Sequence, residues 1–97
     1  MRAGLIFTGT GPIVILTSHD SLTDPDLVRM LAEKGIRKFL AFEVPVETVR
    51  ARYRAHYDMV MDDLRQKDDL RVVDEDGHHV YAEFSLRELG PPIVHDP

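Results

Sequence analysis

The segment Leu5-Ile6-Phe7-Thr8-Gly9-Thr10-Gly11-Pro12-Ile13-Val14-Ile15-Leu16 places a glycine-rich turn between two apolar runs. Glycine adopts the positive φ angles that tight turns need, and the flanking β-branched and aromatic residues favour strands. A dinucleotide-binding loop would instead need a third glycine or alanine after Gly11, with a helix starting there. Val14 occupies that third position, and strand-forming residues follow Pro12. The segment therefore predicts an antiparallel hairpin, with strands over residues 4–8 and 13–17, and excludes a nucleotide loop.

Two amphipathic helices and a buried strand are predicted next along the chain. Asp24 is a good N-cap and Pro25 suits the first helical position, so a helix is expected from there to Gly35. Residues 36–44 carry apolar side chains at both odd-numbered and even-numbered positions, as a strand that is covered on both faces does. Over residues 45–67, apolar positions recur at steps of three and four, which predicts one long helix.

The C-terminal part predicts a second hairpin, a short helical turn and a tail. Strand-forming residues over 70–73 and 79–84 flank Asp74-Glu75-Asp76-Gly77, in which the glycine suits a left-handed turn position. Ser85-Leu86-Arg87-Glu88 has the spacing of a capping box. Residues 85–97 are therefore expected to form a short helical turn followed by a proline-containing tail.

These elements predict a single α+β domain over residues 1–97. Their order, β-β-α-β-α-β-β, indicates a two-layer α/β sandwich: a mixed sheet of about five strands with both helices on one face. Alternation leaves apolar side chains on the other face, among them Leu5, Phe7, Ile13, Ile15, Phe39 and Phe84. A bare apolar patch of a few hundred Å² is unusual on a soluble monomer. We therefore expect the tail or, through homodimerisation, a second copy to cover that face.

The composition is that of an ordinary globular domain and excludes several classes of function. The chain has 97 residues, no cysteine and a formal net charge of −5 at pH 7. Without cysteine, disulfides and thiolate metal sites are excluded. An acidic chain also lacks the basic clusters that bind nucleic acid or anionic membranes, and no apolar run reaches the about 18 residues of a membrane span. We expect a cytoplasmic protein with no nucleic-acid partner and no membrane partner.

The polar segment between the second predicted strand and the first helix is the main candidate ligand-binding site. It leaves a strand end and enters a helix N-terminus, where unpaired N–H groups suit small anions or polar ligands. A carboxylate at the end of the buried strand occupies a position that α/β enzymes often use. The alternative is that the Ser, Thr and Asp side chains only cap the helix. The candidate binding residues are Ser18, His19, Asp20, Ser21, Thr23 and Glu43.

Five histidines, most with an acidic neighbour, suggest a metal site. Imidazole and carboxylate ligands suit zinc or another divalent first-row metal. The spacing is less specific, because no two histidines lie four apart on a predicted helix and adjacent strand residues face opposite sides. We therefore expect these histidines to be surface or hairpin-end residues and the protein to have no cofactor, with zinc or another divalent metal as the alternative. The candidate ligands are His19, Asp20, His56 and His79.

Two functional hypotheses follow from these features. The first is a small non-catalytic accessory or regulatory protein that acts through homodimerisation and association with another protein. The surplus apolar sheet face, the acidic charge and the lack of a catalytic motif in the sequence favour it. The alternative is a small-molecule or divalent-metal-binding domain, or a minor enzyme, with a polar pocket at the loop over residues 17–24. Convergence of the polar residues in one cleft would distinguish the two.

Overall fold

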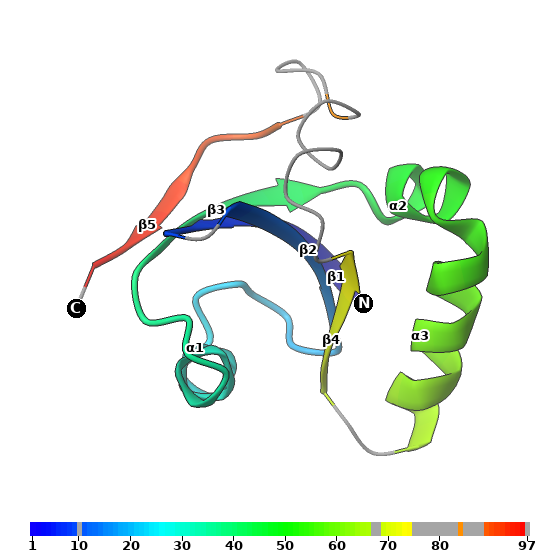
Figure 1. Ribbon diagram of the computed structural model, residues 1–97, viewed down its shortest axis with the longest axis horizontal. Helices are drawn as coiled ribbons and strands as arrows, with labels where there is room; N and C mark the ends of the chain where they lie inside the picture. Colours follow the sequence, from blue (N-terminus) through cyan, green and yellow to red (C-terminus); the bar gives the residue numbers. More distant parts are fainter. Residues whose placement is uncertain (10, 67–68, 75–83, 85–88, 97) are drawn as a thin grey trace.

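The computed structural model describes residues 1–9, 11–66, 69–74, 84 and 89–96. Over these residues it has three helices and five strands (Figure 1). In chain order they are β1 (Arg2–Thr8), β2 (Gly11–Thr17), α1 (Pro25–Glu33), β3 (Phe39–Val44), α2 (Val46–Arg52), α3 (Arg54–Gln66), β4 (Leu70–Asp74) and β5 (Ile93–His95). The predicted α+β class and the five-stranded sheet are confirmed.

The strands form one sheet in the order β4-β2-β1-β3-β5. The predicted hairpin is confirmed, since β1 and β2 pair antiparallel and Gly11, at the turn, has a φ of 126° that favours glycine. The pairs β1–β3, β2–β4 and β3–β5 are also antiparallel, so the sheet is antiparallel over the described strands rather than mixed. The physical reason is the position of β1 in the sheet. The connection from β2 through α1 makes β3 run parallel to β2, but β1 lies between these two strands, so they do not pair with each other.

The fifth strand of the described sheet is β5, which comes from the tail. β5 pairs with β3 and places Val94 opposite Leu40. Of the predicted second hairpin, the turn at Gly77 and its second strand lie outside the described residues, except for Phe84, which is buried. The predicted helical turn over 85–88 also lies outside them. A three-residue strand that follows two prolines has too few positions to show an alternating pattern.

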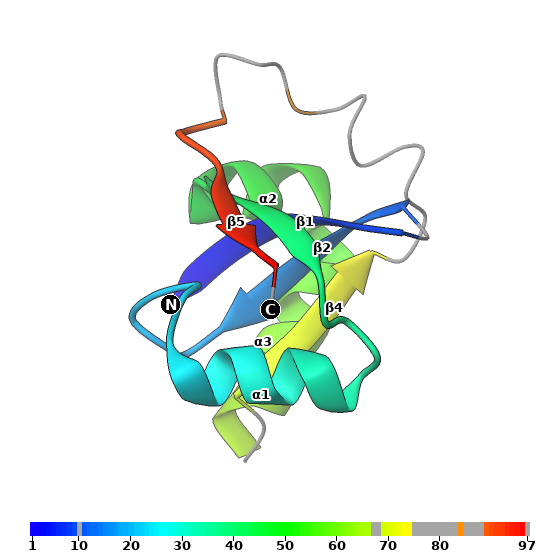
Figure 2. The ribbon, with the colours of Figure 1, turned by 90° about the vertical axis from the view of Figure 1, so that its left-hand side faces the viewer.

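The helices cover both faces of the sheet, so the predicted two-layer arrangement with both helices on one face needs correction. Leu5 belongs to a core with Val60 of α3, whereas the next residue, Ile6, belongs to a core with Leu31 of α1. Figure 2 shows α1 on the near side of the sheet, with α2 and α3 behind it. The apolar stripe of a helix indicates that the helix packs on a sheet but not on which face. The apolar face that the tail or a second copy was expected to cover therefore carries a helix. The six residues assigned to that face are divided between the two faces: Leu5, Phe7 and Phe84 belong to the core with Val60, and Ile13, Ile15 and Phe39 to the core with Leu31.

Helix α1 begins and ends where its capping residues predict. The Asp24 carboxylate accepts a hydrogen bond from the Asp26 backbone N–H at 2.9 Å, and Pro25 is the first helical residue. Gly35 follows the end of the helix with a φ of 87°. This N-terminus lies directly after the polar loop and sets its geometry.

The predicted long helix is divided at Tyr53 into α2 and α3. Tyr53 has φ −123° and ψ 41°, outside the helical region, and its side chain is buried. A straight helix over 45–67 would be roughly 30 Å long, which is about the diameter of a small domain. The change of direction lets Val49 of α2 and Tyr57 of α3 both reach the same core.

Candidate functional site

The loop between β2 and α1 is held in place by a buried leucine. Leu22 is fully buried in the core under α1. Its side chain lies over Gly4 of β1, where an added β-carbon would be 2.9 Å from Leu22 Cδ1. The polar residues on either side of Leu22 therefore belong to a loop that is anchored to the sheet at its centre.

A buried hydroxyl orients the imidazole of His19. Thr17, at the end of β2, is fully buried, and its Oγ1 donates to the backbone carbonyl of Asp69. The same oxygen accepts from the His19 backbone N–H at 3.1 Å and lies 2.9 Å from His19 Nδ1. A carbonyl can only accept, so it takes the single hydroxyl proton, and Nδ1–H must be the donor to Thr17. When it is neutral, the imidazole is therefore the Nδ1–H tautomer, with its Nε2 lone pair on the side of the ring away from Nδ1 and Thr17.

The Thr17 and His19 pair has the contact distance of a nucleophile and its base, but not the accessibility. An activated hydroxyl must reach a substrate as well as its base. Thr17 has no exposed surface, and its proton is donated to a backbone carbonyl. The pair therefore serves to position the imidazole.

Three metal-ligating side chains converge next to this imidazole. The ligand atoms of His19, Asp24 and Asp26 all lie within 4.8 Å of one another, and His19 Nε2 lies 4.0 Å from Asp24 Oδ1. The His19 side chain is 13% exposed and that of Asp24 is 35% exposed. Asp26 is exposed and has Arg29 at 3.7 Å as an ion-pair partner. Imidazole and carboxylate together are suitable ligands for a divalent cation.

The serines and threonine of the loop form local hydrogen bonds. Ser18 Oγ donates to Asp69 Oδ1 at 2.7 Å. Ser21 Oγ accepts from the Thr23 backbone N–H at 3.1 Å and lies 2.8 Å from Thr23 Oγ1. These contacts are typical of turns and caps, as the alternative interpretation of the loop expects.

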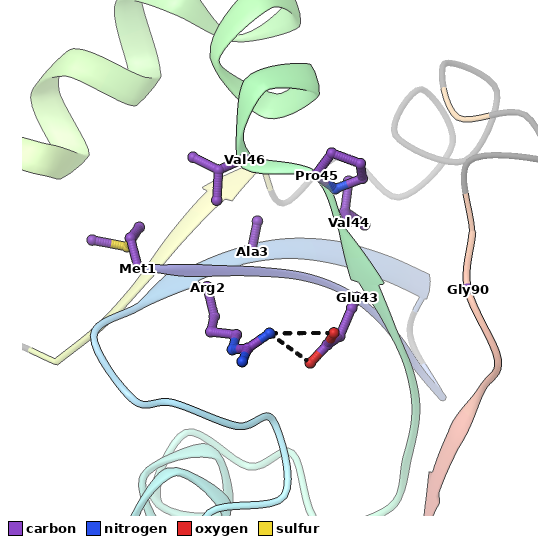
Figure 3. A pocket seen from close by; sticks show the side chains of 8 residues that line it. All are labelled: Met1, Arg2, Ala3, Glu43, Val44, Pro45, Val46 and Gly90. Carbon is purple, nitrogen blue, oxygen red and sulfur yellow. Dashed lines mark hydrogen bonds and ion pairs between the residues drawn. The ribbon is translucent and has the colours of Figure 1, made fainter.

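Glu43 is linked to the loop through Arg2 rather than through His19. The Arg2 guanidinium lies 3.3 Å from Glu43 Oε1 (Figure 3). Arg2 Nε also donates to the backbone carbonyl of Asp20. Both side chains are about half exposed and border a cavity of about 440 Å³ that Pro45 and Gly90 also line. Because the carboxylate and the guanidinium face each other, the cavity presents a neutral ion pair.

Of the four candidate metal ligands, the structure brings only His19 into the cluster. Asp20 is next to His19 in the chain, but its side chain is exposed and outside the three converging groups. His56 is exposed on α3, on the opposite side of the sheet, and His79 lies outside the described residues. Sequence reasoning missed Asp24 and Asp26 as ligands, because both also fit the pattern of a helix cap and first turn.

A second surface lies at the edge of the sheet formed by β5. Val94 is 71% exposed and pairs with Leu40, and alternation places Phe42 on the same face of the sheet. Phe42 packs edge-on against Phe7 with ring centroids 5.8 Å apart. We refer to Leu40, Phe42 and Val94 as the edge strip.

The other face of β5 borders a largely apolar groove. His95 stacks on Phe39 with ring centroids 5.0 Å apart. The groove lies between β5 and the start of α1 and has a volume of about 340 Å³. Its lining residues are Leu22, Thr23, Pro25, Val28, Phe39, Ile93, Val94 and His95. Strand β5 therefore has apolar surface on both of its faces.

Comparisons of this chain with protein-family models, with curated proteins and with solved structures found no match. Within the described part of the chain, no helix combines the length and the apolar composition needed to cross a bilayer.

Proposed function

We propose that this protein is a small, non-catalytic accessory or regulatory protein of the cytoplasm, which acts by homodimerisation and by association with a protein partner at the β5 edge. The observation that carries the proposal is the exposure of Val94. It is 71% exposed on an edge strand, belongs to the edge strip and also lines the apolar groove. Large apolar side chains that are exposed next to other apolar surface are typical of association sites.

The geometry of β5 suits the addition of a further strand. Among the described strands, β5 pairs with β3 alone and ends the sheet on that side. An edge strand presents backbone N–H and C=O groups that can pair with another chain. Strand addition uses these groups for affinity and uses neighbouring apolar pockets for specificity. We infer that the second copy adds a strand at β5 and places apolar side chains against the edge strip.

The non-catalytic part of the proposal is supported by the way in which the loop side chains are engaged. The Ser18 and Thr17 hydroxyls donate to oxygens of Asp69, and Glu43 faces Arg2. Groups that act in catalysis need access to a substrate and a free position near the reacting atoms. The Thr17 hydroxyl, the most buried of this set, has no access to a substrate, and its proton is already donated to the Asp69 carbonyl.

The mass of the protein in solution tests self-association. Native mass spectrometry and sedimentation equilibrium should give twice the monomer mass of 11.1 kDa at micromolar concentration. Val94→Lys places a charge at the proposed contact and should give a monomer. Val94→Thr keeps the β-branched shape that strands favour and should weaken the dimer without disturbing the fold.

Met59→Lys is the matched control, because Met59 is 67% exposed on α3, away from β5. It makes the same change from apolar to charged and should leave the dimer intact. A wild-type protein of monomer mass throughout the micromolar range would contradict the homodimer. Equal weakening by Val94→Lys and Met59→Lys would contradict its location at β5.

A further inference from the structure

We propose that His19 Nε2 and the carboxylates of Asp24 and Asp26 form a binding site for a divalent first-row transition-metal ion, for which Zn²⁺ is the best-suited probe. The site is separate from the β5 edge and does not depend on self-association. It joins the end of β2 to the first turn of α1. The three ligand atoms already lie within 4.8 Å of one another.

The first argument is the orientation of the imidazole. Thr17 Oγ1 gives its proton to the Asp69 carbonyl and accepts from both His19 nitrogens, the backbone N–H and Nδ1–H. The other ring nitrogen, Nε2, is left without a contact to Thr17 and lies 4.0 Å from Asp24 Oδ1. Metal-binding histidines characteristically donate their second ring N–H to an oxygen, which fixes the ring and raises the basicity of the ligating nitrogen. A buried threonine outside the cluster performs this role here.

The second argument is that an imidazole lone pair and two carboxylates converge, with the Asp26 backbone N–H on Asp24 Oδ1 and the exposed Arg29 beside Asp26 as neighbouring donors. In this tautomer, Nε2 has only a lone pair to present to Asp24 Oδ1, which is 4.0 Å away. The nearby carboxylate of Asp26 adds a second negative charge. Converging lone pairs and negative charges repel one another, and the exposed Arg29 guanidinium, 3.7 Å from Asp26 Oδ1, compensates only one of the two carboxylate charges. A divalent cation satisfies all three groups at once.

The distances fit after small side-chain movements. Zn–N and Zn–O bonds of about 2.0–2.2 Å with tetrahedral angles put neighbouring ligand atoms roughly 3.3–3.5 Å apart. The 4.0 Å between His19 and Asp24 has to shorten by only a fraction of an ångström. Asp26 is 73% exposed and can rotate, leaving Arg29, its ion-pair partner at 3.7 Å. Water would occupy the remaining coordination position, as in zinc sites with three protein ligands.

The helix N-terminus does not by itself favour a cation, because its backbone N–H groups carry partial positive charge. In this helix, Asp24 Oδ1 accepts the Asp26 N–H at 2.9 Å and so satisfies one of these donors. Two carboxylates at the same end outweigh the partial charge that remains. The anchoring of the loop by Leu22 over Gly4 holds His19 close to them.

Zinc titration of the purified 97-residue chain tests the site. Isothermal titration with ZnCl₂ near pH 7.5 should give one site per chain. Co²⁺ should bind at the same stoichiometry and give the visible absorption of a nitrogen and oxygen ligand set. His19→Ala, Asp24→Asn and Asp26→Asn should each weaken Zn²⁺ binding by at least about tenfold. Asp24→Asn is informative because asparagine still caps the helix.

Matched controls separate this site from the other acidic and imidazole groups of the chain. Asp20→Asn makes the same change four residues before Asp24, and His56→Ala removes an exposed imidazole from α3. Both should leave the Zn²⁺ affinity within about twofold of wild type. The absence of saturable Zn²⁺ binding by wild type would overturn the proposal. So would full affinity in His19→Ala, or a loss of binding only in the double variant His78→Ala/His79→Ala. The observation of a monomer that binds one Zn²⁺ would support this site and contradict the homodimer.

Discussion

Leu22 packs over Gly4 so closely that a β-carbon at position 4 would lie 2.9 Å from Leu22 Cδ1 and 3.1 Å from Leu22 Cδ2. The side chain of Leu22 has no exposed surface. The contact joins the centre of the loop to the middle of β1. Since this loop carries His19, the absence of a side chain at Gly4 is part of what positions the candidate metal ligand.

The Gly4 contact predicts a non-additive pair of substitutions. Gly4→Ala should reduce the free energy of unfolding by about 1–3 kcal/mol, because the new methyl overpacks a buried site. Leu22→Ala should cost about 2–5 kcal/mol by leaving a cavity. In the Leu22→Ala background, Gly4→Ala should be neutral or stabilising, because the clash is gone and alanine is less flexible than glycine. Urea denaturation of the four proteins measures this cycle, and additive costs would contradict the contact.

The Thr17 hydroxyl predicts a difference between two conservative substitutions. Thr17→Val removes the hydroxyl that accepts from the His19 backbone N–H and contacts His19 Nδ1. It should lower the free energy of unfolding by about 1–3 kcal/mol. Thr17→Ser keeps the hydroxyl, loses one methyl group and should cost about 1 kcal/mol. Thr17→Val should also weaken Zn²⁺ binding by about tenfold, whereas Thr17→Ser should not. Equal Zn²⁺ affinities in the two variants would show that the hydroxyl does not orient the imidazole.

Asp24 has a capping role and a proposed ligand role, which two substitutions should separate. Asp24→Ala removes the acceptor for the Asp26 N–H and should cost about 0.5–2 kcal/mol of stability. Asp24→Asn retains that acceptor and should change stability by only a few tenths of a kcal/mol. Both substitutions should lower Zn²⁺ affinity. Thermal unfolding followed by circular dichroism and zinc titration, performed on the same samples, measure the two roles independently.

Self-association at β5 predicts a thermal midpoint that depends on protein concentration. Dissociation is coupled to unfolding, so the midpoint should rise by a few degrees for each tenfold increase in concentration. Val94→Lys should abolish this dependence, and Met59→Lys should preserve it. Differential scanning calorimetry over the micromolar range measures the midpoint. A midpoint that is independent of concentration in wild type would contradict the dimer.

The features that were predictable from sequence are those in which neighbouring residues determine the geometry. The β1–β2 hairpin follows from Gly11 between two strand-forming runs, and it pairs over its full length. The start of α1 follows from Asp24 and Pro25. In each case the deciding interactions span a few residues, so local conformational preference and the final fold agree.

The candidate metal site was only partly predictable. His19 was recognised from its acidic surroundings, but Asp24 and Asp26 have the same sequence signature whether they cap a helix or also bind a cation. The orientation of the imidazole depends on Asp69, which lies 52 residues after Thr17 and meets it only through the pairing of β2 with β4. No local pattern contains that contact.

By itself the sequence determined the α+β class, the N-terminal hairpin and the boundaries of α1, because glycine conformation, helix capping and apolar periodicity act between near neighbours. Only the tertiary structure decided that α1 lies on the opposite face of the sheet from α2 and α3, that a three-residue segment of the tail supplies β5, and that His19 faces Asp24 and Asp26. The physical reason is that an apolar stripe specifies burial without specifying a partner. The choice of partner depends on loop paths and strand pairings between residues far apart in the chain.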